Sequence, residues 1–552
     1  MKQETIKLNI TGMTCDHCAT GIEKMLSKND GVNEAKVSYQ SGSCECSFDP
    51  SKTSKEEIVN TINETKNYKV TSIVENENKG SIENYFDLII IGGGSAAFSA
   101  AIKAESLGLS TLMVNGGLDF GGTCVNVGCV PSKYLIRAGE TAYHATHSNF
   151  EGIRPKGVDI DFAQVIKDKK KLVATLQEKK YMDVVSDFET LKMVTGWVEF
   201  KDNKTILVDG KTEYTALKFI IATGATTNIP NIEGLNEIGY LTNVSLFDLE
   251  EKSESITIMG AGYIGLEIAT AYNRLGVKVR IIEFTDRVLR TQTHDISEAL
   301  ETQMRKEGIE ILPNFRAVKL EKKGSETIIH CKCPDGSFTQ ITEKGKVVVA
   351  SGTKPNTQKL GLQNIGLQLT KSGHIAVNEK METNLPNIYA VGDVTNTPAF
   401  VYTAAFEGKI AVENAFSGAE NKADYSSLPW VVFTDPQVAG AGLDEAQAEQ
   451  QNIPFEVSKI ELKDVPRAIA ANDTRGFIKL IRNTETDKLI GARIVAPEGG
   501  ELIQQLSMAI KYGITIKDLA ESFYPYLTLG EGIKLAAITF GKDVSKLSCC
   551  AS

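Results

Sequence analysis

Two cysteines separated by four residues lie in the stretch GGTCVNVGCVPSK, residues 121–133. Pro131 suits the first turn of a helix, where its missing N–H costs no hydrogen bond, so Cys129 is expected at a helix N-terminus. The helix dipole and a nearby cation such as Lys133 would favour the Cys129 thiolate, the form that attacks disulfides and binds soft metals. The spacing therefore predicts a redox-active dithiol of Cys124 and Cys129. Two ordinary buried cysteines, or half of a zinc site, are the alternatives.

All ten cysteines of the 552-residue chain fall in close pairs, which limits the chemistry. The pairs are Cys15/Cys18, Cys44/Cys46, Cys124/Cys129, Cys331/Cys333 and Cys549/Cys550. In a reducing compartment, close pairs indicate metal binding or redox catalysis more than structural disulfides.

The first ten residues carry charges where a signal peptide needs an apolar run, and a run of about 18 apolar residues is absent, so we expect a cytoplasmic protein without a membrane span. The net charge of −10 argues against nucleic acid as a partner.

Residues 5–74 have the pattern of a small separate module. Strands are expected at residues 6–10, 35–39 and 43–48 and after Tyr68, and helices at residues 19–28 and 55–64. This βαββαβ order, and the loop GMTCDHC at residues 12–18, resemble a heavy-metal-associated domain. Two thiolates at C-x-x-C spacing can hold one soft ion in two-coordinate geometry, so Cys15 and Cys18 are the expected ligands.

Other interpretations of this module remain open. A thioredoxin-like C-x-x-C is the competing hypothesis, although the order of elements is not that of thioredoxin. Cys44 and Cys46 lie on one face of a predicted strand and are expected to pack in the core. His17 lies between the two ligands and is not expected to bind metal itself.

Two glycine-rich turns each follow a predicted strand and open a predicted helix. The first, GGGSAA at residues 92–97, lies between a strand at 87–91 and a helix ending near residue 106. The second, GAGYIG at residues 260–265, lies between a strand at 255–259 and a helix ending near residue 275. This is the G-x-G-x-x-G/A dinucleotide fingerprint, with the pyrophosphate expected at the helix N-terminus. The predicted contacts are Gly92, Gly94 and Ala97 for one nucleotide and Gly260, Gly262 and Gly265 for the other. The first fold has Asn115 where an acidic residue usually holds the adenosine ribose.

From residue 85 onward, the paired fingerprints and the CVNVGCVPSK stretch resemble the flavin-dependent pyridine nucleotide–disulfide oxidoreductases. Residues 221–225 and 350–356 look like the family's crossovers between domains, and NIYAVGD at residues 387–393 looks like its flavin-binding strand and turn. The resemblance implies FAD held by Gly122, Thr123, Lys133, Thr223, Gly224 and Asp393. It also implies that Cys129 lies against the flavin, that Cys124 is the outer thiol, and that Lys133 pairs with Glu267.

The region from Pro429 onward looks like the family's dimerisation domain, so the resemblance implies a homodimer with active sites across the interface. Disulfide reductases of this family supply a His-Pro acid from that domain, because a departing thiolate needs a proton. Here the corresponding stretch reads FYPYLT at residues 523–528, and all six histidines lie elsewhere, at positions 17, 144, 147, 294, 330 and 374. Tyr240 and Tyr526 match two tyrosines that the family places beside an active-site metal.

The missing histidine, the metal-binding module and the terminal Cys549-Cys550 pair resemble the mercury-reducing members of this family. That resemblance implies reduction of Hg(II), presented as thiol complexes, to Hg(0). A disulfide reductase such as dihydrolipoamide dehydrogenase, or a metal-binding flavoprotein without turnover, are the alternatives. The resemblance implies NADPH as the reductant. Glu283 suits a free ribose hydroxyl and so favours NADH, whereas Arg287 or Arg290 could bind the phosphate of NADPH.

The chain is therefore predicted to be an α/β protein with two Rossmann-like domains, an α+β dimerisation domain and a ferredoxin-like N-terminal module. The expected boundaries are 1–75 for the heavy-metal-associated domain, 76–84 for a linker, 85–237 and 356–428 for the two parts of the FAD-binding domain, 238–355 for the NAD(P)-binding domain, and 429–552 for the dimerisation domain with its Cys-Cys tail.

Overall fold

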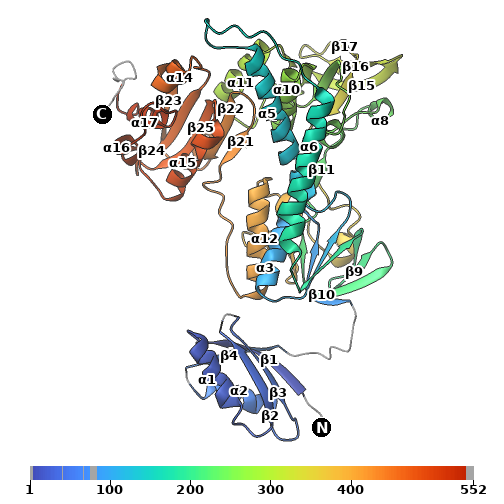
Figure 1. The fold of residues 1–552 in the computed structure, drawn as a ribbon, viewed down its shortest axis with the longest axis vertical. Helices are drawn as coiled ribbons and strands as arrows, with labels where there is room; N and C mark the ends of the chain where they lie inside the picture. Colours follow the sequence, from blue (N-terminus) through green and yellow to red (C-terminus); the bar gives the residue numbers. More distant parts are fainter. Residues whose placement is uncertain (1–3, 40, 66, 75–83, 543–552) are drawn as a thin grey trace. The chain divides into compact units, whose positions relative to one another are not determined.

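The computed structural model describes residues 4–39, 41–65, 67–74 and 84–542. The chain divides into two compact units, residues 1–85 and 86–552 (Figure 1). Most of the expected linker and the terminal pair Cys549 and Cys550 lie outside the described residues. Within the described ranges, no helix is both long enough and apolar enough to cross a membrane.

The N-terminal unit has the predicted βαββαβ order. Its sheet order is β2-β3-β1-β4. The elements are β1 (Glu4–Thr11), α1 (Asp16–Leu26), β2 (Val32–Ser38), β3 (Ser43–Phe48), α2 (Lys55–Asn63) and β4 (Lys69–Val74). Cys44 and Cys46 are fully buried on the inner face of β3, as predicted. Burial raises the pKa of Cys44 to about 12 and that of Cys46 to about 11, so both stay protonated.

The second unit begins with the first dinucleotide fold, a seven-stranded sheet in the order β7-β6-β5-β10-β9-β8 with β20 beside β10. The strands are β5 (Tyr85–Ile91), β6 (Thr111–Asn115), β7 (Leu191–Thr195), β8 (Val198–Asp202), β9 (Thr205–Val208), β10 (Thr212–Ile221) and β20 (Ile388–Ala390). Helices α3 (Ser95–Ser106) and α12 (Val401–Phe416) lie side by side (Figure 1). Strand β20 and helix α12 come from the chain after the second fold, so the first fold is completed by a late segment.

The second dinucleotide fold has a four-stranded parallel sheet in the order β14-β13-β12-β18. Its elements are β12 (Ser255–Met259), α10 (Tyr263–Arg274), β13 (Lys278–Ile282), α11 (His294–Lys306), β14 (Glu310–Leu312) and β18 (Lys346–Val349), with an antiparallel sheet of β15 (Arg316–Lys323), β16 (Glu326–Lys332) and β17 (Phe338–Glu343). The two predicted crossovers pair as β11 (Ala225–Thr227) and β19 (Thr353–Pro355). Thr223 and Asn356 exchange hydrogen bonds there, each 2.9 Å long, which joins the two folds.

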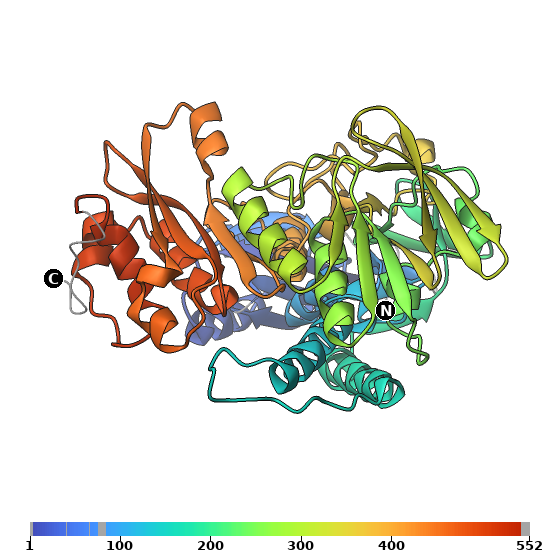
Figure 2. The same cartoon turned by 90° about the horizontal axis from the view of Figure 1, so that it is seen from above.

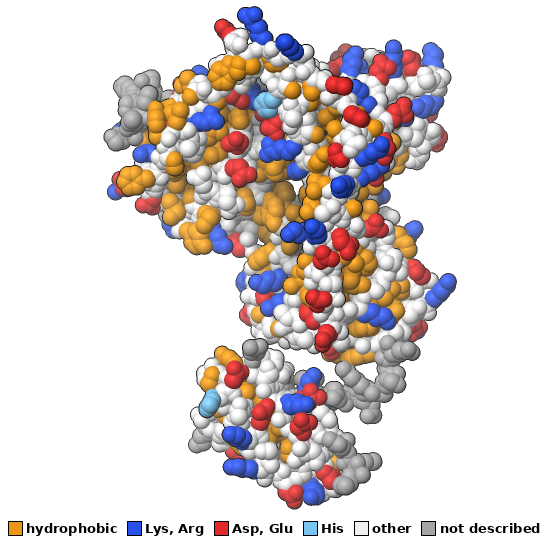
Figure 3. Space-filling view, viewed as in Figure 1, with side chains coloured by type: hydrophobic (Ala, Val, Ile, Leu, Met, Phe, Trp, Pro, Cys, Tyr) orange, Lys and Arg blue, Asp and Glu red, His pale blue; other side chains and the backbone are white. Residues whose placement is uncertain are grey.

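The C-terminal part is a five-stranded antiparallel sheet in the order β21-β22-β25-β24-β23. Its elements include β21 (Trp430–Val432), β22 (Gln437–Gly442), β23 (Phe455–Glu461), β24 (Phe477–Asn483), β25 (Leu489–Ala496), α15 (Gly499–Lys511), α16 (Ile516–Glu521) and α17 (Glu531–Ile538). This sheet packs against the second dinucleotide fold, because Val432, Val438, Phe477 and Val495 belong to the same hydrophobic core as β12, α10 and α11; Figure 2 shows the sheet from above. Large hydrophobic side chains are exposed on the C-terminal part, in and after helices α15 and α16, among them Met508, Tyr512 and Phe523. Hydrophobic groups gather over this region (Figure 3).

Helix α5 (Cys129–Thr146) packs along α10 of the second fold. Gly139 permits the close approach, because a Cβ atom there would lie 2.9 Å from the carbonyl oxygen of Ala271. At the far end of the pair, the Arg274 guanidinium lies over the ring of Tyr143, 4.1 Å from its centroid.

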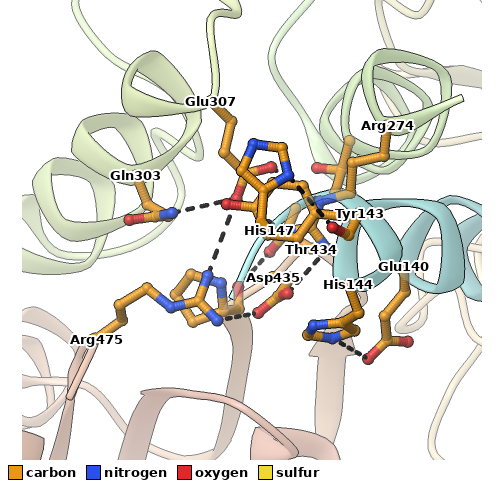
Figure 4. A network of polar contacts seen from close by, with 12 residues as sticks. Glu140, Tyr143, His144, His147, Arg274, Gln303, Glu307, Thr434, Asp435 and Arg475 are labelled. Atoms are coloured by element: carbon orange, nitrogen blue, oxygen red, sulfur yellow. Dashed lines mark hydrogen bonds and ion pairs between the residues drawn. The ribbon is translucent and has the colours of Figure 1, made fainter. Parts of the chain in front are cut away.

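A polar network continues from that end of the helix pair (Figure 4). Arg274 donates to both carboxylate oxygens of Glu307, at 2.8 and 2.7 Å, and to Asp435 at 2.8 Å. Arg475 donates to the other oxygen of Asp435 at 2.9 Å. Because Asp435 and Arg475 belong to the C-terminal part, these buried ion pairs join α5 and α10 to the C-terminal sheet.

The contact between α12 and α3 generates a stability prediction. A Cβ atom at Gly408 would lie 2.3 Å from the carbonyl oxygen of Ala96, which is backbone and cannot move alone. Gly408→Ala should therefore lower stability by about 1–3 kcal/mol despite the better helix propensity of alanine. The thermal unfolding midpoint measures this. Gly152→Ala is the control, because nothing lies within 4 Å of its Cβ position. Equal midpoints for the two variants would contradict the packing argument.

Candidate active site

Cys124 and Cys129 are positioned by two consecutive helices, α4 (Gly122–Asn126) and α5. Cys129 is the first residue of α5, and Pro131 lies in its first turn, as predicted. Gly122 has φ +64° and touches the first fingerprint turn, since a Cβ atom there would lie 2.6 Å from Cα of Gly94. The dithiol segment is thereby held against the turn that is predicted to bind a dinucleotide. Both cysteines are free thiols in this structure.

The two thiols differ in acidity. A hydrogen bond from the Cys124 thiol, followed by the charge of Lys133, lowers the pKa of Cys129 to about 7, although burial opposes this. The same hydrogen bond and burial raise the pKa of Cys124 well above its ordinary value. The direction of this shift agrees with a thiolate at Cys129, and the catalytic role of that thiolate stays a prediction. The largest cause of the lowered pKa of Cys129 is the hydrogen bond from the Cys124 thiol, which the sequence argument did not consider. Lys133 has a smaller effect.

The predicted pair of Lys133 and Glu267 is present. Lys133 Nζ lies 2.7 Å from Glu267 Oε2, and the ammonium group is 4.5 Å from the ring centroid of Phe433. The other carboxylate oxygen of Glu267 accepts a hydrogen bond of 3.1 Å from the backbone N–H of Phe433. The Glu267 carboxylate on α10 thus binds the Lys133 ammonium group on α5 and also holds the backbone at the end of β21.

A cavity of about 540 Å³ lies beside this pair and the two cysteines. Eight predicted site residues line it: Gly94, Thr123, Cys124, Cys129, Lys133, Gly224, Glu267 and Asp393. The others do not line this cavity. Gly92, Ala97, Gly122 and Thr223 are close in sequence to residues that do line it. Gly260, Gly262, Gly265, Glu283 and Arg287 belong to the second fold. Tyr240 packs against the core of the second fold, and Tyr526 is 61% exposed.

The cavity wall suits a flavin dinucleotide. At Gly92, with φ +129°, a Cβ atom would lie 2.2 Å from the carbonyl oxygen of Ala222, so only glycine permits this tight turn. The first residues of α3, Ser95 and Ala96, line the cavity, and the free N–H groups of a helix N-terminus suit a pyrophosphate. The Asp393 carboxyl group also lines the cavity, and burial raises its pKa. It can accept hydrogen bonds from sugar hydroxyls.

Glu407 on α12 is a site residue that the sequence argument missed. Its side chain is fully buried, and its two oxygens accept hydrogen bonds of 2.6 Å from the backbone N–H of Gly392 and from the hydroxyl of Tyr425. It therefore fixes the turn that presents Asp393 to the cavity. An acidic residue within the apolar helix sequence AAFEGKIAV was the available signal.

In the second fold, Glu283 is buried and its oxygens accept hydrogen bonds from the backbone N–H groups of Ala261 (2.6 Å) and Thr285 (2.7 Å). It thus supports the glycine-rich turn. Arg287 donates to Asp286 at 2.8 Å, and its Nε is buried without a hydrogen-bond partner among the described residues. The Arg290 side chain is 65% exposed.

Tyr263 lies inside the second fingerprint and lines the cavity. The sequence argument did not predict Tyr263 as a site residue.

In the N-terminal unit, the Cys15 and Cys18 sulfurs lie 3.9 Å apart at the start of α1, where Cys15 is exposed and Cys18 is half-buried. Hydrogen bonds from Thr14, whose hydroxyl is 3.5 Å from the Cys18 sulfur, and from Tyr68 lower the pKa of Cys18 to about 6. No group of three or more potential metal-binding side chains occurs in the described ranges. Cys331 is buried in the second fold, and burial raises its pKa to about 11.

Comparisons with known proteins agree with this arrangement. Residues 86–408 match the pyridine nucleotide-disulphide oxidoreductase model, residues 428–537 match the dimerisation domain of that family, and residues 7–69 match the heavy-metal-associated domain. Among solved structures, the Cu(II) complex of the HOCl-induced flavoprotein disulfide reductase RclA from Escherichia coli aligns with a TM-score of 0.74 and 26% identity. That alignment covers 83% of this chain and all of RclA.

The chain therefore belongs to the pyridine nucleotide-disulphide oxidoreductases, enzymes that use a flavin and a pyridine nucleotide. Mercuric reductase of Staphylococcus aureus is 38% identical over 100% of both chains, and that of Lysinibacillus sphaericus is 39% identical over 99% of both. Within the family, the chain groups with the mercuric reductases.

The acidity of the dithiol generates a prediction about pH. Because the pKa of Cys129 is lowered from 9.0 to about 7, its thiolate fraction should rise as the pH passes through 7. In alkylation of the reduced protein by iodoacetamide, followed by mass spectrometry, Cys129 should be modified before Cys124, and its modification rate should have a pH midpoint near 7. Cys124→Ala removes the hydrogen-bond donor and should move the midpoint upward, whereas Cys331→Ala should leave it unchanged. Faster alkylation of Cys124 would show that the two roles are exchanged.

Proposed function

We propose that this protein reduces Hg(II) to Hg(0) at Cys124 and Cys129, with FAD in the cavity and NADPH as the electron donor. The observation that carries the proposal is a dithiol with one low-pKa member, beside a fixed cation, at a cavity built for a flavin. The mercuric reductases that match the chain over its whole length support mercury as the substrate. The domain boundaries and the remaining predicted site residues are part of this proposal.

The reaction requires two electrons, and its balance is NADPH plus Hg(II) giving NADP⁺, H⁺ and Hg(0). FAD, when bound, supplies the carrier that takes a hydride from the nicotinamide and passes the electrons on. The Cys129 thiolate is ready to bind Hg(II) at neutral pH, and Cys124 loses its proton as it becomes the second ligand. Soft, two-coordinate Hg(II) suits this thiolate pair. Lys133, held by Glu267, supplies positive charge beside the site throughout.

The absence of a general acid distinguishes this function from disulfide reduction. A disulfide substrate releases a thiolate that must be protonated, whereas reduced mercury leaves without a proton. The dimerisation domain contains no histidine, because all six histidines lie at or before position 374. A dihydrolipoamide dehydrogenase-like enzyme is therefore the weaker candidate, as is a flavoprotein that only binds metal.

NADPH is preferred over NADH in this proposal. Both oxygens of Glu283 already accept backbone hydrogen bonds, which leaves the carboxylate less available to a ribose hydroxyl. Arg287 and the exposed Arg290 provide positive charge for the extra phosphate. The close cysteine pairs suit a reducing compartment, so we propose a cytoplasmic location, where thiols stay reduced.

A substrate comparison tests the proposed function. NADPH oxidation by the full-length protein should be rapid with Hg(II) in an excess of small thiol, and slow with oxidised lipoamide. Cys129→Ala should abolish the mercury reaction, whereas Cys333→Ala should retain it. Lipoamide activity comparable to the mercury activity would overturn the proposal. No oxidation with either substrate would favour a protein that only binds metal.

The dimerisation domain supports a homodimer, and we propose that the Cys549-Cys550 tail delivers mercury to the active site of the other subunit. Subunit mixing tests this. One variant carries Cys124→Ala and Cys129→Ala, and the other carries Cys549→Ala and Cys550→Ala. Each homodimer should reduce Hg(II) with bulky thiol ligands poorly, because each lacks one pair. The heterodimer should recover up to roughly half of wild-type activity, one complete site of the two that twofold symmetry provides. Without recovery in confirmed heterodimers, the tail serves its own subunit or none.

A further inference from the structure

Trp197 is a large aromatic residue at an exposed position of the first dinucleotide fold. It is one of two tryptophans in the chain, lies between β7 and β8, and is 66% exposed. Its backbone is held firmly: its N–H donates to the Asp209 carboxylate at 2.8 Å, and its carbonyl accepts from the Asp209 N–H at 2.8 Å. The backbone that carries the exposed indole is therefore held in place.

The indole lies over a pair of glycines that directly follow β6. A Cβ atom at Gly116 would lie 3.1 Å from Cδ2 of the indole, and one at Gly117 would lie 3.4 Å from its Cη2. These ring atoms are on opposite sides of the six-membered ring, so the ring rests on the Gly116-Gly117 backbone. Side chains at those two positions would crowd it. The remaining surface of the indole is open.

This location is the carboxyl edge of two neighbouring parallel strands, β6 and β7. In an open α/β sheet, ligands bind beyond the carboxyl ends of the strands. The pyrophosphate site is at the N-terminus of α3, and the residue that ends β6 is the one expected to contact the adenosine ribose. An adenosine group bound there would therefore extend from the turn at Gly93 past the end of β6, toward Gly116, Gly117 and Trp197.

Asn115, the residue at the end of β6, offers the adenosine ribose a weaker contact than an acidic residue would. Asn115 is buried, and its Nδ2 donates to the carbonyl of Leu118 at 2.8 Å. Its side chain also lies against the fingerprint turn, because a Cβ atom at Gly93 would be 2.7 Å from Asn115 Oδ1. Asn115 is neutral and its Nδ2 is already used, so the ribose loses the strong, charged acceptor that the fingerprint usually provides.

We propose that the indole of Trp197 stacks on the adenine of FAD and supplies affinity that the ribose contact at Asn115 lacks. A flat aromatic base packs well on an aromatic side chain, and such stacking is tolerant of the exact base position. The inference rests on FAD binding to the first fold, as proposed above, and adds a residue that determines how tightly the adenine half is held. It requires no change in the isoalloxazine half of the cavity.

Flavin affinity tests this inference independently of turnover. Full-length protein is loaded with FAD or with FMN, which lacks the adenosine half, and the dissociation constants are measured by equilibrium dialysis. Trp197→Ala should weaken FAD binding roughly 10-fold to 100-fold, the loss expected for one stacked base. FMN binding should stay unchanged. Phe338→Ala, which removes a 70% exposed aromatic ring from β17 of the second fold, should change neither constant.

Two further variants separate stacking from packing. Trp197→Phe keeps an aromatic face and should bind FAD within a few-fold of wild type, whereas Trp197→Leu covers the glycines without one and should resemble Trp197→Ala. Unchanged FAD affinity in Trp197→Ala, equal weakening of FMN, or wild-type affinity in Trp197→Leu would each overturn the inference. Failure of the wild-type protein to bind FAD would instead contradict the proposed function.

Discussion

The ion pair of Lys133 and Glu267 is the contact on which the rest of the active site depends. It joins α5, which carries Cys129, to α10 of the second dinucleotide fold at 2.7 Å. The same carboxylate accepts the N–H of Phe433, so three structural parts meet at one side chain. Farther along the two helices, one side chain again joins three parts: Arg274 of α10 contacts Tyr143 of α5, Glu307 of the second fold and Asp435 of the C-terminal part. The relative position of the two nucleotide folds beside the dithiol is thus fixed at both ends of one helix pair.

The cysteine pairs differ in how their thiolates are controlled. In the dithiol, a hydrogen bond from Cys124 lowers the pKa of Cys129, and in the N-terminal unit, hydrogen bonds from Thr14 do the same for Cys18. Burial has the opposite effect on Cys44, Cys46 and Cys331. Soft metals bind thiolates. Local hydrogen bonding therefore makes some cysteine thiols ready to bind metal, whereas burial keeps other cysteine thiols protonated.

Local patterns in the sequence predicted much of this structure. Strands β3 and β12 begin and end where alternation and apolar runs placed them, and Cys129 begins a helix as Pro131 indicated. The Lys133–Glu267 pair was found only through family resemblance, because its members are 134 positions apart. Glu407, Tyr263 and the Arg274 network escaped prediction for a related reason. Each acts through partners that are distant in sequence, and a local sequence pattern does not predict which distant residues will be in contact. The contact of the Trp197 indole with Gly116 and Gly117 likewise joins residues about 80 positions apart.

The central claim is that two electrons from one nicotinamide reduce one mercury ion at the dithiol. The most direct test measures Hg(0) released as vapour together with NADPH consumed, in a sealed vessel with excess small thiol. The account predicts one Hg(0) for each NADPH in the wild-type protein, and no vapour from a protein with Cys124→Ala and Cys129→Ala. NADPH consumption without mercury vapour, or undiminished vapour from the double variant, would contradict it.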